Sequence, residues 1–185
     1  MFSTLFNFVL KPSPTINQIM QERRLKLALL GYSVGAFSIV LAHGLISEIS
    51  VIGFIFRFLF FLFFSVCISF FFSATAHLFL ELTTGRGRAA GLFVLLGLSE
   101  FAKTLLVAFS LIALNFPALY EYKGLFIFVV LLLQLFFVLY MMKHAYGLSK
   151  KMTFFALVIS FVPAIICFFA TIFMLLSAIF WLIFA

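Results

Sequence analysis

Charged residues are scarce in this chain, and one acid is missing altogether. Only 9% of the 185 residues are charged and 66% are hydrophobic, and the five acids are all glutamates because the sequence contains no aspartate. A typical soluble domain has about a quarter of its residues charged. So little charge cannot cover a surface that faces water, and the lack of aspartate excludes the catalytic sites that depend on it. We therefore predict a membrane protein that is not an enzyme and holds no cofactor.

Cysteine and histidine are too few, and too scattered, for a metal centre. Cys67 and Cys167 both lie inside apolar runs, where they are typical of small buried hydrophobic side chains. The three histidines form neither an HExxH pair nor a cluster with cysteine, so we expect no metal site. His77 and Glu81 are four residues apart, a spacing that predicts one pair between an imidazole and a carboxylate on a helix.

Long apolar runs dominate what remains. A hydrocarbon core about 30 Å thick is crossed by about 20 apolar helical residues, and five stretches reach that length. They lie at about 27–46, 51–82, 89–114, 124–146 and 153–184. These runs do not alternate as the strands of a β-barrel do, and Pro163 is expected to kink the fifth. The predicted fold is an all-α membrane protein, with a five-transmembrane-helix bundle over residues 27–185.

Residues 1–26 predict a separate element on the membrane surface. Ser13 is a suitable N-cap and Pro14 a suitable first helical residue. An apolar face then recurs at helical spacing, formed by Ile16, Ile19, Met20 and Leu27. These features predict an interfacial amphipathic helix on the cytoplasmic leaflet, and a solvated linker is the alternative because the amphipathic character is modest. Four side chains nearer the N-terminus are expected to dip into the bilayer beside it: Phe2, Leu5, Phe6 and Phe8.

The basic residues between the predicted spans fall mainly on one side of the membrane. Nine of them share that side: Lys11, Arg23, Arg24, Lys26, Arg86, Arg88, Lys143, Lys150 and Lys151. The other side has Lys123 alone, together with Glu48 and Glu121. Because cytoplasmic loops carry an excess of Lys and Arg, we predict a cytoplasmic N-terminus. The C-terminus then lies on the opposite side of the cell membrane.

Part of this basic face is expected to bind anionic lipid headgroups, each basic residue contributing about 1 kcal/mol near the surface. The candidates are Arg23, Arg24, Arg86, Arg88, Lys150 and Lys151. The turn Gly85–Arg88 offers amide and guanidinium groups to a lipid phosphate, but it lacks the rest of a nucleotide-binding loop. The net charge of +7 comes from residues scattered between apolar runs, so nucleic acid is not an expected partner.

Three charged residues within the predicted spans are the candidates for an intramembrane site: Arg57, Glu100 and Lys103. Arg57 is close enough to the outer start of its span to extend to the interface, with a functional role as the alternative. Glu100 and Lys103 share one helix face in the middle of the third span, which predicts a buried salt bridge. The pair either orients this helix or belongs to a substrate or proton path. Further polar side chains could join the same interior: Ser65, Ser69, Ser73, Ser99 and Gln134.

Three short stretches together follow a known pattern. They are the proline segment at 10–15 with the helix that continues to residue 23, the Gly-Arg-Gly loop within 77–89, and residues 140–151 before the last span. In these stretches and in its predicted topology the chain resembles the prokaryotic branch of the Yip-domain family, the Ypt/Rab-interacting-type five-span membrane proteins. Relatives often carry a proline in the third span where this chain has residues 100–103. The long hydrophilic N-terminal region of eukaryotic members, which act in vesicle traffic and membrane shaping, is missing. The resemblance therefore implies the fold more than it implies GTPase binding.

These features favour a non-enzymatic membrane scaffold or accessory subunit. Short loops, few interior charges and a basic cytoplasmic face suit a protein that binds another membrane protein, self-associates or organises lipid. The alternative is a small transporter, channel or lipid-moving protein with a polar path around Glu100 and Lys103. A membrane enzyme is the third hypothesis.

Overall fold

The computed structural model describes residues 8, 12–22, 24–85 and 88–184. Beyond residue 8, these residues form, in order, α2 (Pro12–Glu22), α3 (Leu25–Gly44), α4 (Val51–Thr84), α5 (Ala89–Ser99), the 3-10 helix η1 (Glu100–Lys103), α6 (Thr104–Asn115), the 3-10 helix η2 (Pro117–Tyr122), α7 (Lys123–Tyr146) and α8 (Lys150–Phe184). Five helical segments in these ranges are long and apolar enough to cross a membrane: Leu25–Gly44, Val51–Thr84, Ala89–Asn115, Ala118–Tyr146 and Lys150–Met174. The predicted all-α, five-span membrane fold is confirmed.

The third span is one helical segment, as predicted, but a short 3-10 turn interrupts its α-helical geometry. The α-helical geometry ends at Ser99, η1 follows for four residues, and α6 resumes at Thr104. The sequence of η1 is Glu-Phe-Ala-Lys, so neither proline nor glycine marks the break. In a 3-10 helix the side chains at positions i and i+3 eclipse each other. The turn therefore aligns Glu100 with Lys103.

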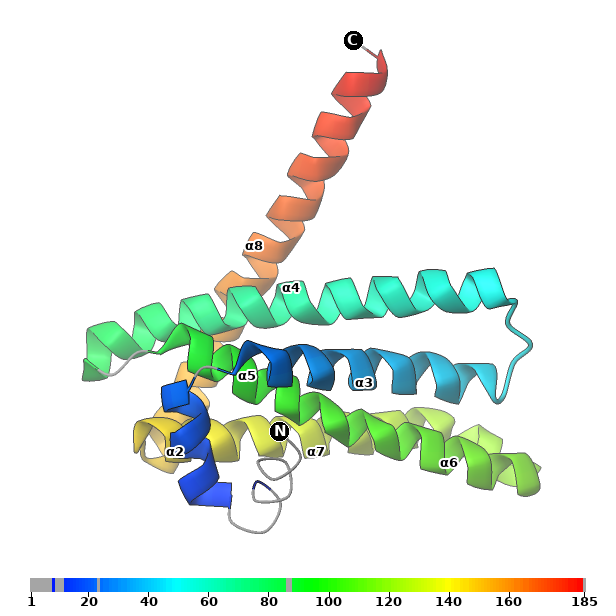
Figure 1. Cartoon of the computed structure of the whole chain (residues 1–185), viewed down its shortest axis with the longest axis horizontal. Coiled ribbons are helices and arrows are strands. Elements are labelled where there is room, and N and C mark those ends of the chain that lie inside the picture. The colour runs from blue at the N-terminus through cyan, green and yellow to red at the C-terminus, as the bar shows by residue number, and fades with distance from the viewer. Residues whose placement is uncertain (1–7, 9–11, 23, 86–87, 185) are drawn as a thin grey trace.

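Four spans lie side by side, and the fifth diverges from them. In Figure 1, α3, α4, α7 and the pair α5–α6 follow one common direction, whereas α8 crosses α4 and projects away from the bundle. α8 contacts α4 and α7. The short helix α2 runs across the ends of the spans and contacts α5 and α7. The bundle thus has a surface helix at one end and a splayed fifth span.

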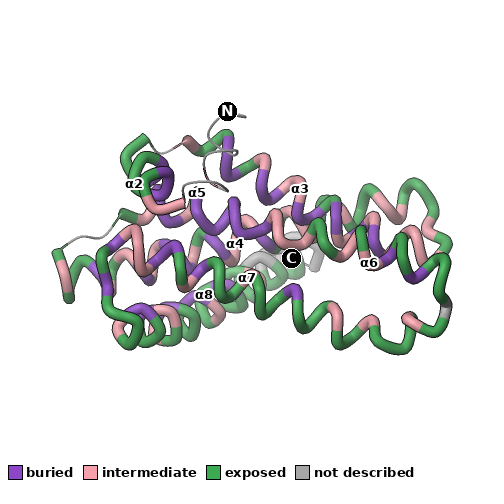
Figure 2. The backbone as a smooth tube through the Cα atoms, turned by 90° about the horizontal axis from the view of Figure 1, so that it is seen from below, coloured by how far each residue is buried: buried purple, intermediate pink, exposed green. Residues whose placement is uncertain are grey.

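The hydrophobic core is concentrated at the end of the bundle that carries α2. Figure 2 shows buried residues along α2, α3 and α5, whereas much of α6 and the beginning of α7 are exposed. Ile16 and Ile19 of α2 are fully buried in one cluster with Leu92 of α5 and Met142 of α7. The predicted amphipathic helix is present, and its apolar face packs against the bundle instead of the leaflet.

The beginning of α2 differs from the prediction. Ser13 lies within the first turn of a helix that already includes Pro12, so Ser13 is not its N-cap. The Ser13 hydroxyl oxygen lies 3.4 Å from the hydroxyl of Tyr140 and 3.4 Å from Nδ1 of His144, both on α7. Phe8 packs against the hydrophobic core. The other side chains expected to enter the bilayer lie outside the described residues: Phe2, Leu5 and Phe6.

Local signals explain where two of the long spans begin and end. At the start of α4, the Ser50 hydroxyl accepts a hydrogen bond from the amide of Gly53 at 3.1 Å, the usual role of an N-cap serine. α4 and α7 each end at a glycine in the left-handed conformation, Gly85 with φ 65° and Gly147 with φ 66°. Both glycines therefore act as helix C-caps.

The last span continues as one helix through Pro163, and the predicted kink stays a prediction. Proline removes one backbone hydrogen bond from the preceding turn. Close to this turn, the Thr75 hydroxyl of α4 lies 2.8 Å from the carbonyl oxygen of Ser160 and can donate to it. This contact joins α4 to α8 near the weakened turn.

Glycines allow α3 and α5 to pack at backbone distance. A Cβ atom added to Gly31 would lie 2.0 Å from the carbonyl oxygen of Gly97, and one added to Gly97 would lie 2.7 Å from the carbonyl oxygen of Ala28. One turn along α3, a Cβ atom on Gly35 would lie 2.7 Å from the carboxylate of Glu100. Small residues at such positions let membrane helices approach closely. The α3–α5 contact therefore depends on the absence of side chains.

We predict that Gly31→Ala destabilises the bundle by about 1–3 kcal/mol, the usual cost of overpacking, because the new methyl group has no space beside the Gly97 carbonyl. The matched control is Gly124→Ala in α7, where a Cβ atom would meet nothing within 4 Å. The stability of both variants is measured in detergent micelles by unfolding them with increasing dodecyl sulfate. Circular dichroism monitors the loss of helix. Equal stability of the two variants would contradict the close α3–α5 contact.

Candidate functional site

Glu100 is the centre of a buried polar cluster inside the bundle. It lies in η1, and only 5% of its surface is exposed. Its Oε2 atom accepts a hydrogen bond from Nζ of Lys103 at 2.5 Å, and its Oε1 atom accepts one from Nε2 of Gln134 at 2.8 Å. Gln134 lies on α7, so the cluster links the third and fourth spans. The predicted Glu100–Lys103 ion pair is confirmed.

Two neighbouring residues complete this polar cluster. The Ser99 hydroxyl donates to the carbonyl oxygen of Leu96 at 2.7 Å, and its oxygen lies 3.4 Å from Nε2 of Gln134. Gly35 of α3 leaves the space that the Glu100 carboxylate occupies. Ser99 and Gln134 thus join the interior as predicted. Three other candidates are buried on α4, and within the described ranges none is hydrogen-bonded to Glu100: Ser65, Ser69 and Ser73.

The polar cluster is closed and its ion pair is neutral. The side chains of Lys103 and Glu100 are 12% and 6% exposed, so neither is open to bulk solvent. A single charge at this depth costs several kcal/mol, and pairing reduces that cost. Both carboxylate oxygens of Glu100 already have fixed partners. This geometry favours the interpretation in which the pair fixes the inward face of the third span.

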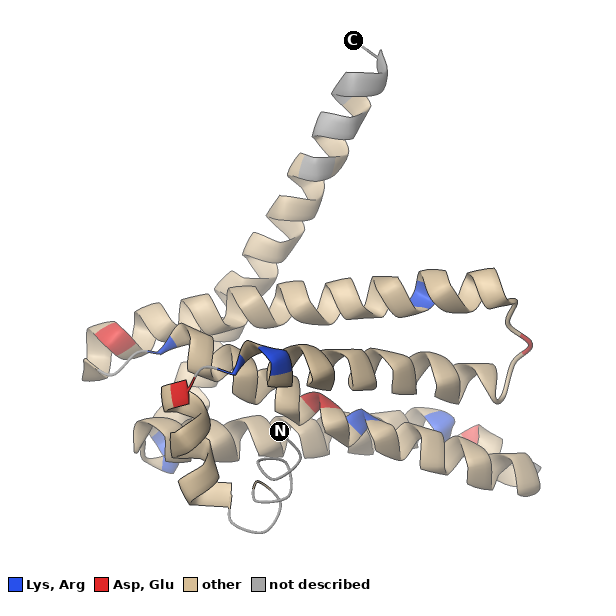
Figure 3. Ribbon diagram, in the orientation of Figure 1, with Lys and Arg blue, Asp and Glu red and all other residues tan. Residues whose placement is uncertain are grey.

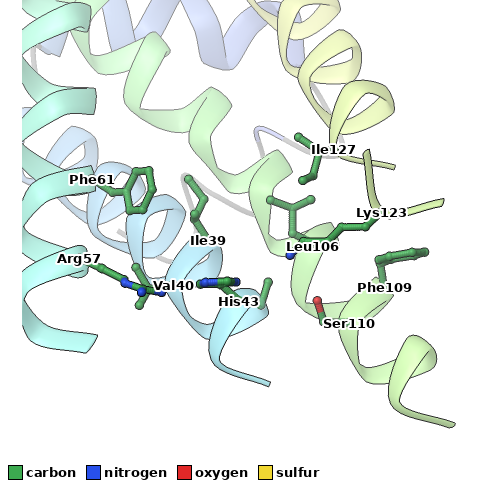
Figure 4. Close-up of a pocket in the computed structure, with 11 residues that line it drawn as sticks. Ile39, Val40, His43, Arg57, Phe61, Leu106, Phe109, Ser110, Lys123 and Ile127 are labelled. Carbon is green, nitrogen blue, oxygen red and sulfur yellow. The ribbon is translucent and has the colours of Figure 1, made fainter. Parts of the chain in front are cut away.

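A second group of polar residues lines a cavity at the opposite end of the bundle from α2. We call it the outer cavity; it has a volume of about 220 Å³ and is lined by Ile39, Val40, Ala42, His43, Arg57, Phe61, Leu106, Phe109, Ser110, Lys123 and Ile127. Figure 4 shows Arg57 reaching from α4 toward His43 on α3, and Lys123 reaching from the beginning of α7 toward Leu106 and Ser110. Arg57 was expected to extend to the interface, and its side chain lines this cavity. His43 and Lys123 were not among the predicted site residues, although Lys123 is the lone basic residue of the loops predicted to lie on the non-cytoplasmic side.

The predicted lipid-headgroup residues that the structure describes lie at the end of the bundle that carries α2. Figure 3 shows Lys and Arg at this end, where α3, α5 and α8 begin. Lys150 and Lys151 are exposed, and Arg24 forms an ion pair with Glu22. Arg88 contributes to a polar cavity of about 450 Å³, which is also lined by Asn17, Met20, Gln21, Glu81, Gly85 and Ala145. Arg23 and Arg86 lie outside the described residues.

Nδ1 of His77 is buried and has no hydrogen-bond partner within the described part of the chain, and the predicted pair of His77 with Glu81 stays a prediction. Cys167 is exposed and Cys67 is half-buried, so neither is the fully buried side chain that the sequence suggested. Among the described residues, no three His, Cys or acidic side chains come together as a metal site would require.

We predict that Glu100→Ala destabilises the protein by about 3–5 kcal/mol, because it leaves the Lys103 charge buried without a partner. The double variant Glu100→Ala/Lys103→Ala removes both charges and should be more stable than Glu100→Ala alone. Stabilities of the wild type, both single variants and the double variant form a double-mutant cycle, measured as for Gly31→Ala. Additive losses would show that the two side chains are not energetically coupled.

The chain matches no protein-family model, no curated protein and no solved structure. The resemblance to Yip-domain proteins therefore stays a prediction. Three features of the structure bear on function: the polar cluster, the outer cavity and the position of α8.

Proposed function

We propose that this protein is a non-enzymatic membrane scaffold or accessory subunit, and that it binds another membrane protein through the splayed part of α8. The observation that carries the proposal is the exposure of apolar side chains beyond Phe168, in the part of this helix whose side chains the structure describes. Phe169, Phe173 and Leu176 are 62%, 72% and 61% exposed. Their spacing of four and then three residues places them on one face of the helix.

The face of α8 that carries these three residues suits a neighbouring helix. Residues spaced by four and three form the seam along which membrane helices pack, through van der Waals contact between their side chains. α8 packs against α4 over its first part, where Phe168 and Ala164 are buried. Beyond that part it projects from the bundle in Figure 1. An apolar helix that leaves its own bundle offers a long surface to a second membrane protein or to a second copy of the chain.

A transport path around Glu100 has less support. Both oxygens of the carboxylate are occupied, and the lining of the outer cavity does not include Glu100 or Lys103. The scaffold proposal needs no path, and it assigns the polar cluster to orienting the third span.

We also propose that the chain lies in the cell membrane with α2 on the cytoplasmic side. The excess of Lys and Arg at the ends of the spans next to α2 supports this orientation. The same residues would attract anionic headgroups of the inner leaflet.

Kinship with the Yip-domain family is a third proposal. Five spans and a short helix before the first of them agree with that family's expected architecture. The 3-10 turn η1 supports the kinship as well, because it interrupts the third span where relatives are expected to carry a proline.

We predict that a photoactivatable phenylalanine analogue at position 173 cross-links in native membranes to a protein of one defined mass. Phe56 on α4 is the matched control, because it is 71% exposed and also apolar. The same analogue at position 56 should cross-link to lipid alone, since the other face of α4 packs within the bundle. Adducts are identified by mass spectrometry after purification. Lipid adducts at both positions would contradict the scaffold proposal.

We predict that single cysteines report opposite sides of the membrane, in a background where Cys67 and Cys167 are replaced by alanine. Ser149→Cys, between α7 and α8, should react with an impermeant maleimide only after the membrane is opened. Glu48→Cys, between α3 and α4, should react in intact cells. The reverse pattern would overturn the proposed orientation.

A further inference from the structure

We propose that the outer cavity binds the phosphate group of an anionic phospholipid. The site lies in the opposite half of the bundle from the basic end at which headgroup binding was expected, and it goes beyond the scaffold role of α8. Its polar lining consists of His43, Arg57, Ser110 and Lys123. Of the described residues that line it, none is acidic.

The basic side chains of the outer cavity come from separate helices and converge. His43 is supplied by α3, Arg57 by α4 and Lys123 by α7, and Figure 4 shows the three side chains directed toward the space between these helices. In the described ranges none of the three makes a hydrogen bond or an ion pair with the protein. This distinguishes them from Lys103, whose charge is neutralised by Glu100. An arginine guanidinium matches a phosphate through paired hydrogen bonds, and a lysine adds a point charge.

The walls of the outer cavity favour a phosphate attached to an apolar chain over a free, hydrated ion. Most of the lining is apolar, with Phe61, Leu106 and Ile127 on three different helices. The volume of about 220 Å³ corresponds to about seven waters in the liquid. That is below the range of pockets for drug-sized ligands, about 300–1,000 Å³. The space suits a headgroup phosphate and the beginning of its glycerol chain.

The position of the outer cavity gives a lipid a way in from the side. Within the described chain, the backbone of α4 does not come close to that of α6 or α7. Among the described elements, α3 is the one that contacts both α4 and α6. The cavity lies between α4 on one side and α6 and α7 on the other, so it can open toward the bilayer. Arg57 is six residues from the start of α4, about 9 Å along the helix, and Lys123 is the first residue of α7. Both are near the depth at which headgroups meet the hydrocarbon core.

The experiment compares lipids retained by the full chain. The protein is purified in mild detergent with equal amounts of phosphatidylglycerol and phosphatidylcholine that carry the same acyl chains, and native mass spectrometry counts the lipids that stay bound. The wild type should retain phosphatidylglycerol in preference. Arg57→Gln/Lys123→Gln should reduce that retention about tenfold or more, since it removes two charge-assisted contacts.

The matched control is Lys150→Gln/Lys151→Gln, which removes the same charge at the other end of the bundle. It should retain phosphatidylglycerol as the wild type does. An equal loss in the control would overturn the proposal, because it would show general charge attraction. Equal retention of phosphatidylcholine, or displacement of the lipid by millimolar glycerol 3-phosphate, would overturn it too.

A second variant tests the cavity with its charges intact. Leu106 lines the outer cavity from α6, so Leu106→Trp should fill part of the cavity and also reduce retention of phosphatidylglycerol. The circular dichroism spectrum and size-exclusion profile should match those of the wild type, which separates loss of the site from loss of the fold. A folded Leu106→Trp protein that retains the lipid unchanged would place the lipid elsewhere.

Discussion

At Gly31 and Gly97 the backbones of α3 and α5 come so close that no side chain fits between them. Within a bilayer, apolar side chains gain little by leaving lipid, so helices are held together by close packing and by hydrogen bonds between them. The α3–α5 contact supplies both, because it brings the Tyr32 hydroxyl of α3 to 2.9 Å from the carbonyl oxygen of Phe93. The core under α2 and the inward direction of Glu100 both depend on the relative position of α3 and α5.

The two polar regions of the bundle differ in whether the protein neutralises their charges. Around Glu100 the protein supplies every partner, so that a charge pair in mid-membrane is neutral and buried. In the outer cavity the described protein supplies basic groups and no acid to meet them. The first arrangement stabilises a fixed interior. The second leaves positive charge directed into a space between helices, where an anion from outside the protein would be stabilised.

Much of the fold could be predicted because the bilayer leaves few alternatives. An apolar run of about 20 residues can satisfy its backbone in lipid only as a helix, and the glycine at position 147 marks a helix end by its own conformational freedom. The Glu100–Lys103 pair followed from spacing along one helix. Gln134, which also binds Glu100, lies on another span. No sequence spacing therefore indicates that these two residues are in contact.

The parts that were missed depend on tertiary structure or on weak local signals. Arg57, His43 and Lys123 are far apart in sequence and meet only because three helices converge. Ser13 has the chemistry of an N-cap, but α2 already includes Pro12 and the hydroxyl contacts α7 instead. The sequence of η1 holds no helix breaker, so hydropathy alone describes one uninterrupted span.

The 3-10 turn also sets the rotational phase of α6, the half of the third span that follows it. Four residues wound at about 120° each, instead of about 100°, advance the helix by about 80° more than an α-helix would. Leu106, Phe109 and Ser110 line the outer cavity in that phase. If η1 returned to α-helical geometry, α6 would turn back by about 80° and shorten the span by about 2 Å. These side chains would then leave the cavity wall, so the shape of the outer cavity depends on the winding of η1.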